Sequence, residues 1–190
     1  MPNAAAWLTA ANPFHRARTA DEALRQARMG SVALVIMAVS GLWNTLWTYL
    51  NRDDLEAFMA QAMATDPQLA GSDMAQGMIS GVTTFTMALG VIFAAVYLIL
   101  AIVQWQRPNH WIPIILLVIA LWGMLSMVQA LVIPNPNMPS MQEALAMTPV
   151  WKRALGYAEQ VVTTVLFIAS WRGAWALKTR FAPADPDDPA

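Results

Sequence analysis

Residues 78–105 read MISGVTTFTMALGVIFAAVYLILAIVQW and contain no aspartate, glutamate, lysine or arginine. A helix needs about 20 such residues to cross a hydrocarbon core of about 30 Å, so this stretch is long enough to span a membrane. Inside a bilayer every backbone amide must be paired within the chain, and a run without the alternating pattern of barrel strands forms a helix. Comparable apolar stretches occur at about 29–50, 111–133 and 150–177. The sequence therefore predicts an all-α polytopic membrane protein in which four transmembrane helices form a bundle.

The composition supports a membrane location. Of the 190 residues, 57% are hydrophobic and 12% are charged, whereas about a quarter of the residues in soluble proteins are charged. The formal net charge of −1 creates no overall positive field, so nucleic acid is not expected among the partners. Because the chain contains no cysteine, disulfides, thiolate zinc sites, iron–sulfur clusters and cysteine nucleophiles are excluded.

Three regions follow from the distribution of apolar residues. Residues 1–28 form an N-terminal segment, residues 29–178 contain the four spans, and residues 179–190 form an acidic, proline-rich tail that we expect to be disordered. The N-terminal segment lacks the cationic region that begins a signal peptide. We therefore expect the first span to direct insertion and to be retained.

Capping signals predict short amphipathic helices at the surface. Thr19-Ala-Asp-Glu22 has the spacing of a capping box and predicts a helix leading to Arg28. Ser140-Met-Gln-Glu143 predicts another over residues 141–147. Thr148-Pro149 is expected to supply the N-cap and the first residue of the fourth span. A further surface helix is predicted after Asp53 and Asp54 by apolar residues at helical spacing, namely Leu55, Phe58, Met59, Ala62 and Met63.

Basic residues predict the orientation. If both termini and the 106–110 turn share one side, that side carries Arg16, Arg18, Arg25, Arg28, Arg107, Arg172, Lys178 and Arg180. The opposite side carries Arg52, Lys152 and Arg153. Because basic loops stay in the cytoplasm, we expect a multi-pass protein of the cell membrane, typical of a bacterial inner membrane, with both termini cytoplasmic.

Small and polar residues predict where the spans contact protein. Helices in lipid associate through close packing and interhelical hydrogen bonds. In the second span, Thr86, Gly90 and Ala94 form one small stripe. In the fourth span, one face carries Gly156, Glu159, Thr163 and Ser170. In the first span, Ala33, Ser40 and Asn44 share a face.

Glu159 is the acidic residue that this alignment places well inside a span. An ionised side chain at mid-bilayer costs about 2.5–3.5 kcal/mol on insertion scales, so such residues need a partner or water. One interpretation is structural, through a hydrogen bond to Asn44 or Thr163 or an ion pair with Lys152 or Arg153. The other is a role in proton, ion or ligand binding.

Methionines and histidines offer further sites. Seven of the thirteen methionines lie in or beside the outer segments, at positions 59, 63, 74, 78, 138, 141 and 147. Thioethers are ligands for copper(I), but methionine also fills apolar helix faces. The histidines, His15 and His110, both fall on the inner side, whereas a haem site needs ligands inside the bundle. We expect no cofactor.

Function is predicted mainly from absences in the sequence. The chain has no His-Glu-x-x-His motif, no phosphate-binding glycine loop and no Gly-x-Ser-x-Gly elbow, so no catalytic residue is expected. The small-residue faces favour a non-catalytic accessory or assembly subunit that packs against a larger membrane complex or against itself. The alternatives are a small oligomeric transporter or channel using Glu159, Asn44 and Thr163, and copper handling by the outer methionines. The expected partners are the lipid bilayer and other membrane subunits.

Overall fold

A computed structural model describes residues 4–63, 73–132 and 148–181. Helices make up 87% of the structure, and the described residues contain no strand. The all-α prediction is therefore confirmed. The helices are α1 (Ala4–Ala11), α2 (Ala20–Ala27), α3 (Met29–Leu50), α4 (Arg52–Met63), α5 (Asp73–Gln106), α6 (Trp111–Val132) and α8 (Val150–Thr179).

Two helical stretches are long and apolar enough to cross a membrane by length and composition. They are Ala20–Leu50, where α2 runs into α3, and Gln76–Gln106 within α5. Among the residues described, Trp111–Leu125 of α6 is a shorter apolar stretch, and α8 is not among the stretches that meet the criterion. These stretches support membrane association, while the four-span topology stays a prediction.

Helix boundaries agree with the expected ranges, with small differences. Helix α3 covers the expected residues 29–50, whereas α5 begins at Asp73, before the expected residue 78. Pro149 itself occupies the N-cap position of α8, so the expectation that Thr148 is the cap and Pro149 the first helical residue is wrong by one position. The reason is the backbone of Pro149, whose ψ of 140° is outside the helical region. Helix α1 was not expected.

The capping box at Thr19 forms as predicted. The Thr19 side chain accepts a hydrogen bond from the backbone N–H of Glu22 at 3.2 Å. The Glu22 carboxylate in turn accepts one from the backbone N–H of Arg18 at 2.7 Å, and this bond lowers the pKa of Glu22 below its usual value. The predicted helix at 141–147 and most of the acidic tail, residues 182–190, lie outside the described residues.

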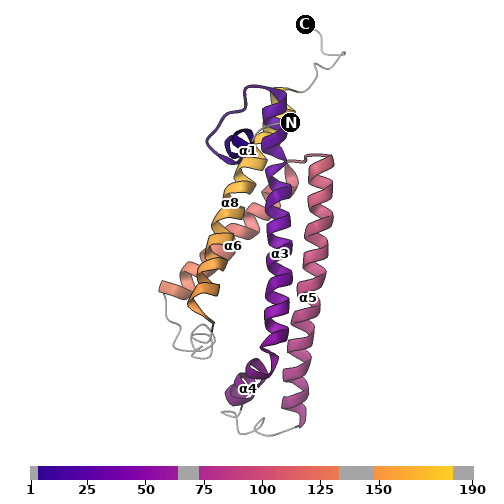
Figure 1. The fold of residues 1–190 in the computed structure, drawn as a ribbon, viewed down its shortest axis with the longest axis vertical. Coiled ribbons are helices and arrows are strands. Elements are labelled where there is room, and N and C mark those ends of the chain that lie inside the picture. The colour runs from indigo at the N-terminus through magenta and orange to yellow at the C-terminus, as the bar shows by residue number, and fades with distance from the viewer. Residues whose placement is uncertain (1–3, 64–72, 133–147, 182–190) are drawn as a thin grey trace.

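The long helices touch in the order α5, α3, α8, α6. Figure 1 shows that α3 and α5 run side by side, and that α6 and α8 form a second pair. The two pairs meet where α1, α2 and the 107–110 turn lie, which we call the terminal end. They diverge toward α4, which we call the open end.

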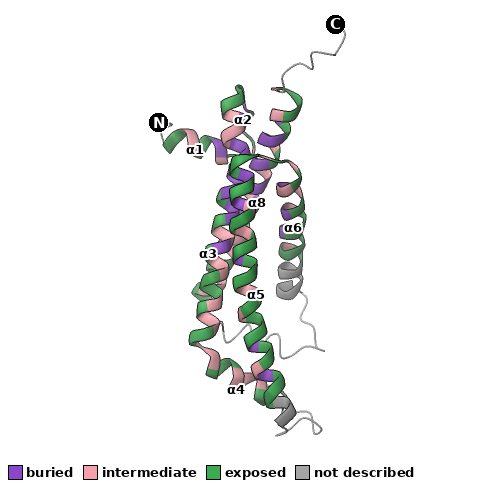
Figure 2. Ribbon diagram, turned by 90° about the vertical axis from the view of Figure 1, so that its right-hand side faces the viewer, coloured by how far each residue is buried: buried purple, intermediate pink, exposed green. Residues whose placement is uncertain are grey.

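The buried residues concentrate at the terminal end, as Figure 2 shows. The main cluster joins α1, α3, α5, α6 and α8, and its members are Ala10, Met29, Ala33, Leu34, Ala101, Leu116, Leu166, Phe167 and Ala169. Elsewhere the long helices expose apolar side chains: on α5, Ile92, Phe93 and Ile99 are each more than half exposed. A soluble monomer rarely exposes so continuous an apolar surface.

A buried polar network joins three helices at the terminal end. The Ser170 hydroxyl donates to the carbonyl oxygen of Ala27 at 2.6 Å. Gln104, which is fully buried, donates to the same carbonyl at 3.3 Å and to Ser170 Oγ at 3.4 Å. Its side-chain oxygen accepts from the backbone N–H of Asn109 at 3.1 Å. The network satisfies its buried groups and fixes α2, α5 and α8 relative to one another.

Glycines allow the helices to approach closely at this end. A Cβ on Gly30 would lie 2.5 Å from Ser170 Oγ. A Cβ on Gly173 would lie 2.7 Å from the carbonyl oxygen of Ala23, in the backbone of α2. The absence of a side chain at Gly173 is therefore what allows α2 to pack on α8.

Candidate functional site

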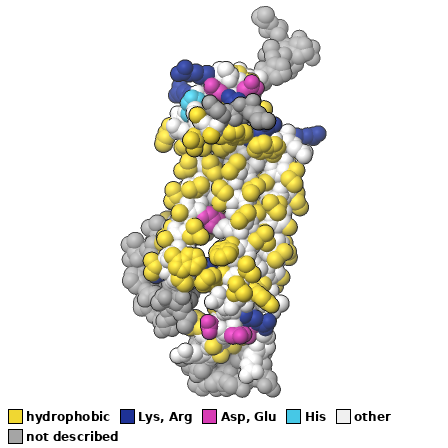
Figure 3. Space-filling view, viewed as in Figure 1, with side chains coloured by type: hydrophobic (Ala, Val, Ile, Leu, Met, Phe, Trp, Pro, Cys, Tyr) yellow, Lys and Arg dark blue, Asp and Glu magenta, His cyan; other side chains and the backbone are white. Residues whose placement is uncertain are grey.

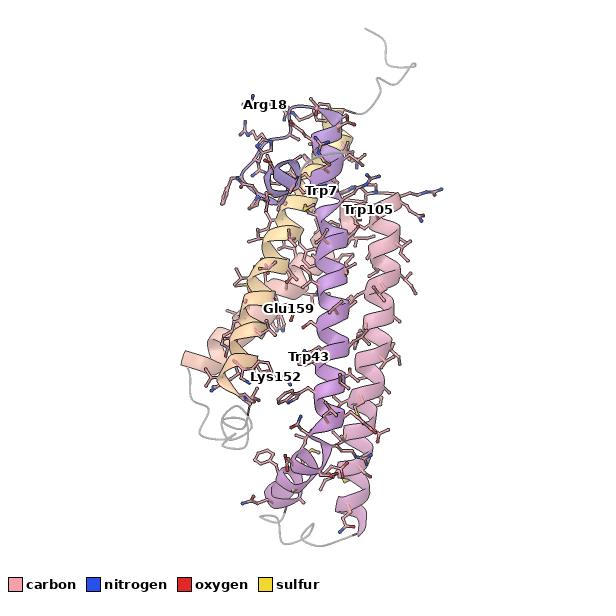
Figure 4. The ribbon with its side chains drawn as sticks, in the orientation of Figure 1. Trp7, Arg18, Trp43, Trp105, Lys152 and Glu159 are labelled. Carbon is pink, nitrogen blue, oxygen red and sulfur yellow. The ribbon has the colours of Figure 1, made fainter. Side chains whose placement is uncertain are left out.

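A groove of about 350 Å³ separates α3 from α8 at mid-length, where the two pairs of helices begin to diverge. Its walls are apolar apart from Ser40 and Glu159, and the lining residues are Val35, Ile36, Val39, Ser40, Trp43, Leu155 and Glu159. Figure 3 shows an acidic side chain in the middle of the hydrophobic face, beside a hollow. Figure 4 identifies Glu159 at this level, between α8 and α3.

The Ser40 hydroxyl donates a hydrogen bond to Glu159 Oε2. The Glu159 side chain is half-buried, and Tyr97 of α5 is close enough to interact with it electrostatically. An ionised carboxylate offers about four acceptor positions. Among the described side chains one hydroxyl bonds to the Glu159 carboxylate, which leaves most of this capacity unused on the groove side.

The structure places the other residues predicted around Glu159 differently. Asn44 is exposed one turn beyond Ser40, and Ser40 bonds to Glu159 in its place. Thr163 is buried, but its hydroxyl donates to the backbone oxygen of Glu159 at 2.9 Å, within α8. Among the described ion pairs, none joins Glu159 to Lys152 or Arg153.

Sequence reasoning put Ser40 on the same face as Asn44 but did not select it as the partner. Both residues lie on one face of α3 because they are four positions apart. Which of them is level with Glu159 depends on how far α3 is shifted along α8. That shift is set by tertiary contacts at the terminal end, so no local signal could have identified Ser40.

The predicted packing residues fall in different environments. Ser170 is buried in the polar network, and Ala94 is buried against α3, where it lies 3.9 Å from the position of a Cβ on Gly41. A Cβ on Gly90 would collide with the Thr45 hydroxyl, so Gly90 also lies in the α3–α5 interface. Thr86 and Gly156 are exposed, and a Cβ on Gly156 would meet no atom within 4 Å.

A second pocket, of about 440 Å³, lies further toward the open end and shares no lining residue with the groove. Its residues come from α3, α4 and the start of α8: Trp47, Thr48, Asn51, Asp54, Leu55, Phe58, Thr148, Pro149 and Lys152. The ammonium group of Lys152 lies 4.7 Å from the centre of the Trp47 ring, and Trp151 packs edge-on against the same ring at 5.4 Å. The lining of this second pocket is more polar than the lining of the groove at Glu159.

No metal centre is found in the part of the chain that the structure describes: no three His, Asp or Glu side chains converge there. Of the outer methionines, positions 138, 141 and 147 lie outside the described residues, so copper binding stays a prediction. His15 and His110 both lie at the terminal end, where His110 contacts Trp111 and Trp175.

Comparisons with known proteins were made with protein-family models, characterised sequences and solved structures, and no match was found in any of the three.

Proposed function

We propose that this chain is a multi-pass protein of the cell membrane and a non-catalytic accessory or assembly subunit. In this proposal α3, α5, α6 and α8 each cross the bilayer, and both termini lie on the cytoplasmic side. The α3–α8 groove receives a transmembrane helix of a larger membrane complex or of a second copy. The single observation that carries the proposal is the position of Glu159, on the wall of an open groove that is apolar apart from Glu159 and Ser40.

The cost of an exposed carboxyl group in lipid supports a protein occupant. An acidic group at mid-bilayer costs about 2.5–3.5 kcal/mol on insertion scales. The Ser40 hydroxyl offsets only part of this cost, because a carboxylate can accept several hydrogen bonds. A partner helix carrying a polar side chain would pair with Glu159 and fill the apolar walls at the same time. Lipid chains could fill the walls but could not donate a hydrogen bond.

The residues around Glu159 are also suited to contact another helix. Val39 and Leu155 are 61% and 54% exposed on the two rims of the groove, so a partner would bury both. The basic residues at the terminal end, such as Arg16 and Arg107, favour the cytoplasmic placement of that end.

Site-specific photocrosslinking in membranes tests this proposal. A photoreactive residue at Val39, in the groove, is compared with one at Ile99, which is equally exposed at 61% but lies on α5. We expect a discrete protein crosslink from position 39 that disappears with Glu159→Leu, and no such crosslink from position 99. A monodisperse monomer without partners in mild detergent, or equal crosslinking from both positions, would contradict the proposal.

A second candidate function is a small oligomeric transporter or channel. It is favoured by the polar residues Asn51, Asp54 and Lys152, which line the second pocket toward the open end. Copies that closed this groove against one another would enclose a path running from these residues to Glu159. Flux through proteoliposomes that is unchanged by Glu159→Gln would exclude this role.

A further inference from the structure

A third cavity lies at the terminal end, between the chain that links α1 to α2 and the last turns of α8. It encloses about 400 Å³. We call this cavity the cationic cleft. Its basic and aromatic lining residues are His15, Arg16, Trp171, Arg172, Trp175 and Arg180. A neighbouring hollow shares Arg16 and Arg180 and adds Arg18. Figure 3 shows basic and histidine side chains gathered at this end, next to the hydrophobic face.

The positive charge of the cationic cleft is not neutralised by the described residues. Neither hollow is lined by a described carboxylate, and none of the described ion pairs involves Arg16, Arg172 or Arg180. Glu22, close by, is already engaged: it accepts from the Arg18 backbone and lies 3.8 Å from His15 Nε2. Within the part of the chain that the structure describes, the three guanidinium groups therefore remain available for an anion.

The cleft is held in shape before any ligand binds. Gln26 is 2% exposed, and its side-chain amide donates to the carbonyl oxygens of Asn12 at 3.4 Å and His15 at 3.1 Å. These bonds fix the linking chain beside α8. Ala17 is buried in a small cluster with Ala23 and Ala176, which fixes it further.

We propose that the cationic cleft binds the phosphate group of an anionic phospholipid. Arginine pairs with phosphate oxygens through two parallel hydrogen bonds, and tryptophan favours the headgroup level of a bilayer. Trp171 and Trp175 are 38% and 49% exposed and line the same cavity as the arginines. The cleft thus offers charge for a headgroup and, next to it, apolar surface for acyl chains. The inference relies on the membrane placement proposed above, but not on the partner of Glu159.

Native mass spectrometry of the full chain in mild detergent tests the site. Phosphatidylglycerol and phosphatidylcholine with identical acyl chains are added, and we expect phosphatidylglycerol to bind at least about tenfold more tightly. Arg16→Gln/Arg172→Gln/Arg180→Gln should abolish this preference. The control Arg25→Gln/Arg107→Gln/Lys178→Gln removes the same charge from the same end but leaves the cleft intact, and should keep the preference. Circular dichroism checks that both variants are folded.

Three results would overturn the proposal: no preference for phosphatidylglycerol in the unaltered chain, the same loss in both variants, or competition by inorganic phosphate as strong as that by the lipid. Flotation with phosphatidylcholine vesicles tests membrane placement separately. A chain that floats with these vesicles but does not select phosphatidylglycerol would contradict the lipid site and leave the proposed function standing.

Discussion

The two ends of the long helices handle polar side chains in opposite ways. At the terminal end, Gln104 and Ser170 are fully buried, and each bonds to a neighbouring helix. Toward the open end, Glu159 and Lys152 are only partly buried and lie beside cavities. Helices α3 and α8 touch at the terminal end, where Gly30 and Ala33 lie, and are separated by a groove toward the open end.

This difference shows how one polar residue can stabilise a fold and another can remain available for binding. A buried amide with every hydrogen bond made contributes to a rigid arrangement, because opening it would leave unpaired groups. A carboxyl group with one hydroxyl partner in an open groove can gain more by acquiring further partners. Regions with few buried contacts are also those that open or rearrange most easily.

The largest loss of stability is expected when a side chain is added between α2 and α8. Gly173→Ala places a Cβ against the backbone of α2, 2.7 Å from Ala23 O, and backbone atoms cannot move aside as a side chain can. We expect the free energy of unfolding to fall by about 3 kcal/mol. The control Gly156→Ala, on the same helix with no atom within 4 Å of the new Cβ, should raise it by up to about 1 kcal/mol. Unfolding in detergent, followed by circular dichroism, compares the two, and equal stabilities would contradict the close packing.

A smaller loss of stability is expected when the polar network around Gln104 is disrupted. Gln104→Leu leaves the backbone N–H of Asn109 without its side-chain acceptor and removes two donated bonds, so the free energy of unfolding should fall by about 1–3 kcal/mol. Gln106→Leu, at an exposed position two residues further along α5, should change it by less than about 0.5 kcal/mol. The same unfolding assay measures both variants. Similar values for the two would mean that the network does not fix the terminal end.

The smallest effect on stability is expected when the contact between Lys152 and Trp47 at the open end is removed. Lys152 and Trp47 form a cation–π contact across the groove, at 4.7 Å. A double-mutant cycle with Lys152→Met and Trp47→Leu should give a coupling energy of about 0.5–1 kcal/mol. Thermal unfolding of the four proteins supplies the values. A coupling energy as large as the loss from Gln104→Leu would remove the contrast between the two ends.

Much of the local structure could be predicted from the sequence. The apolar run at 29–50 became α3 with the same ends, and the capping box at Thr19 formed at the start of α2. Helix α4 lies where the spacing of Leu55 and Phe58 predicted it. These signals are readable because a helix pairs each backbone group within four residues, and a cap acts within its first turn.

The contacts between helices were predicted less well, and the candidate site depends on them. Sequence periodicity put Ser40, Asn44, Glu159 and Thr163 on inward faces, but Ser40 alone bonds to the Glu159 carboxylate. Gln104, the centre of the polar network, was not among the predicted packing residues, although it is a polar residue within the apolar run 78–105. The contact order α5, α3, α8, α6 and the groove between α3 and α8 were also not predicted.

The sequence by itself determined which residues are helical, that the helices are too apolar for an ordinary soluble surface, and that Glu159 is an isolated acidic group among apolar neighbours. Only the tertiary structure decided that Glu159 faces a groove, that Ser40 reaches it, and that Arg16 lines one cleft with Arg172 and Arg180 from the other end of the chain. The physical reason is that backbone pairing and capping act over a few residues. The crossing angle and relative shift of two helices depend instead on every side chain along their interface.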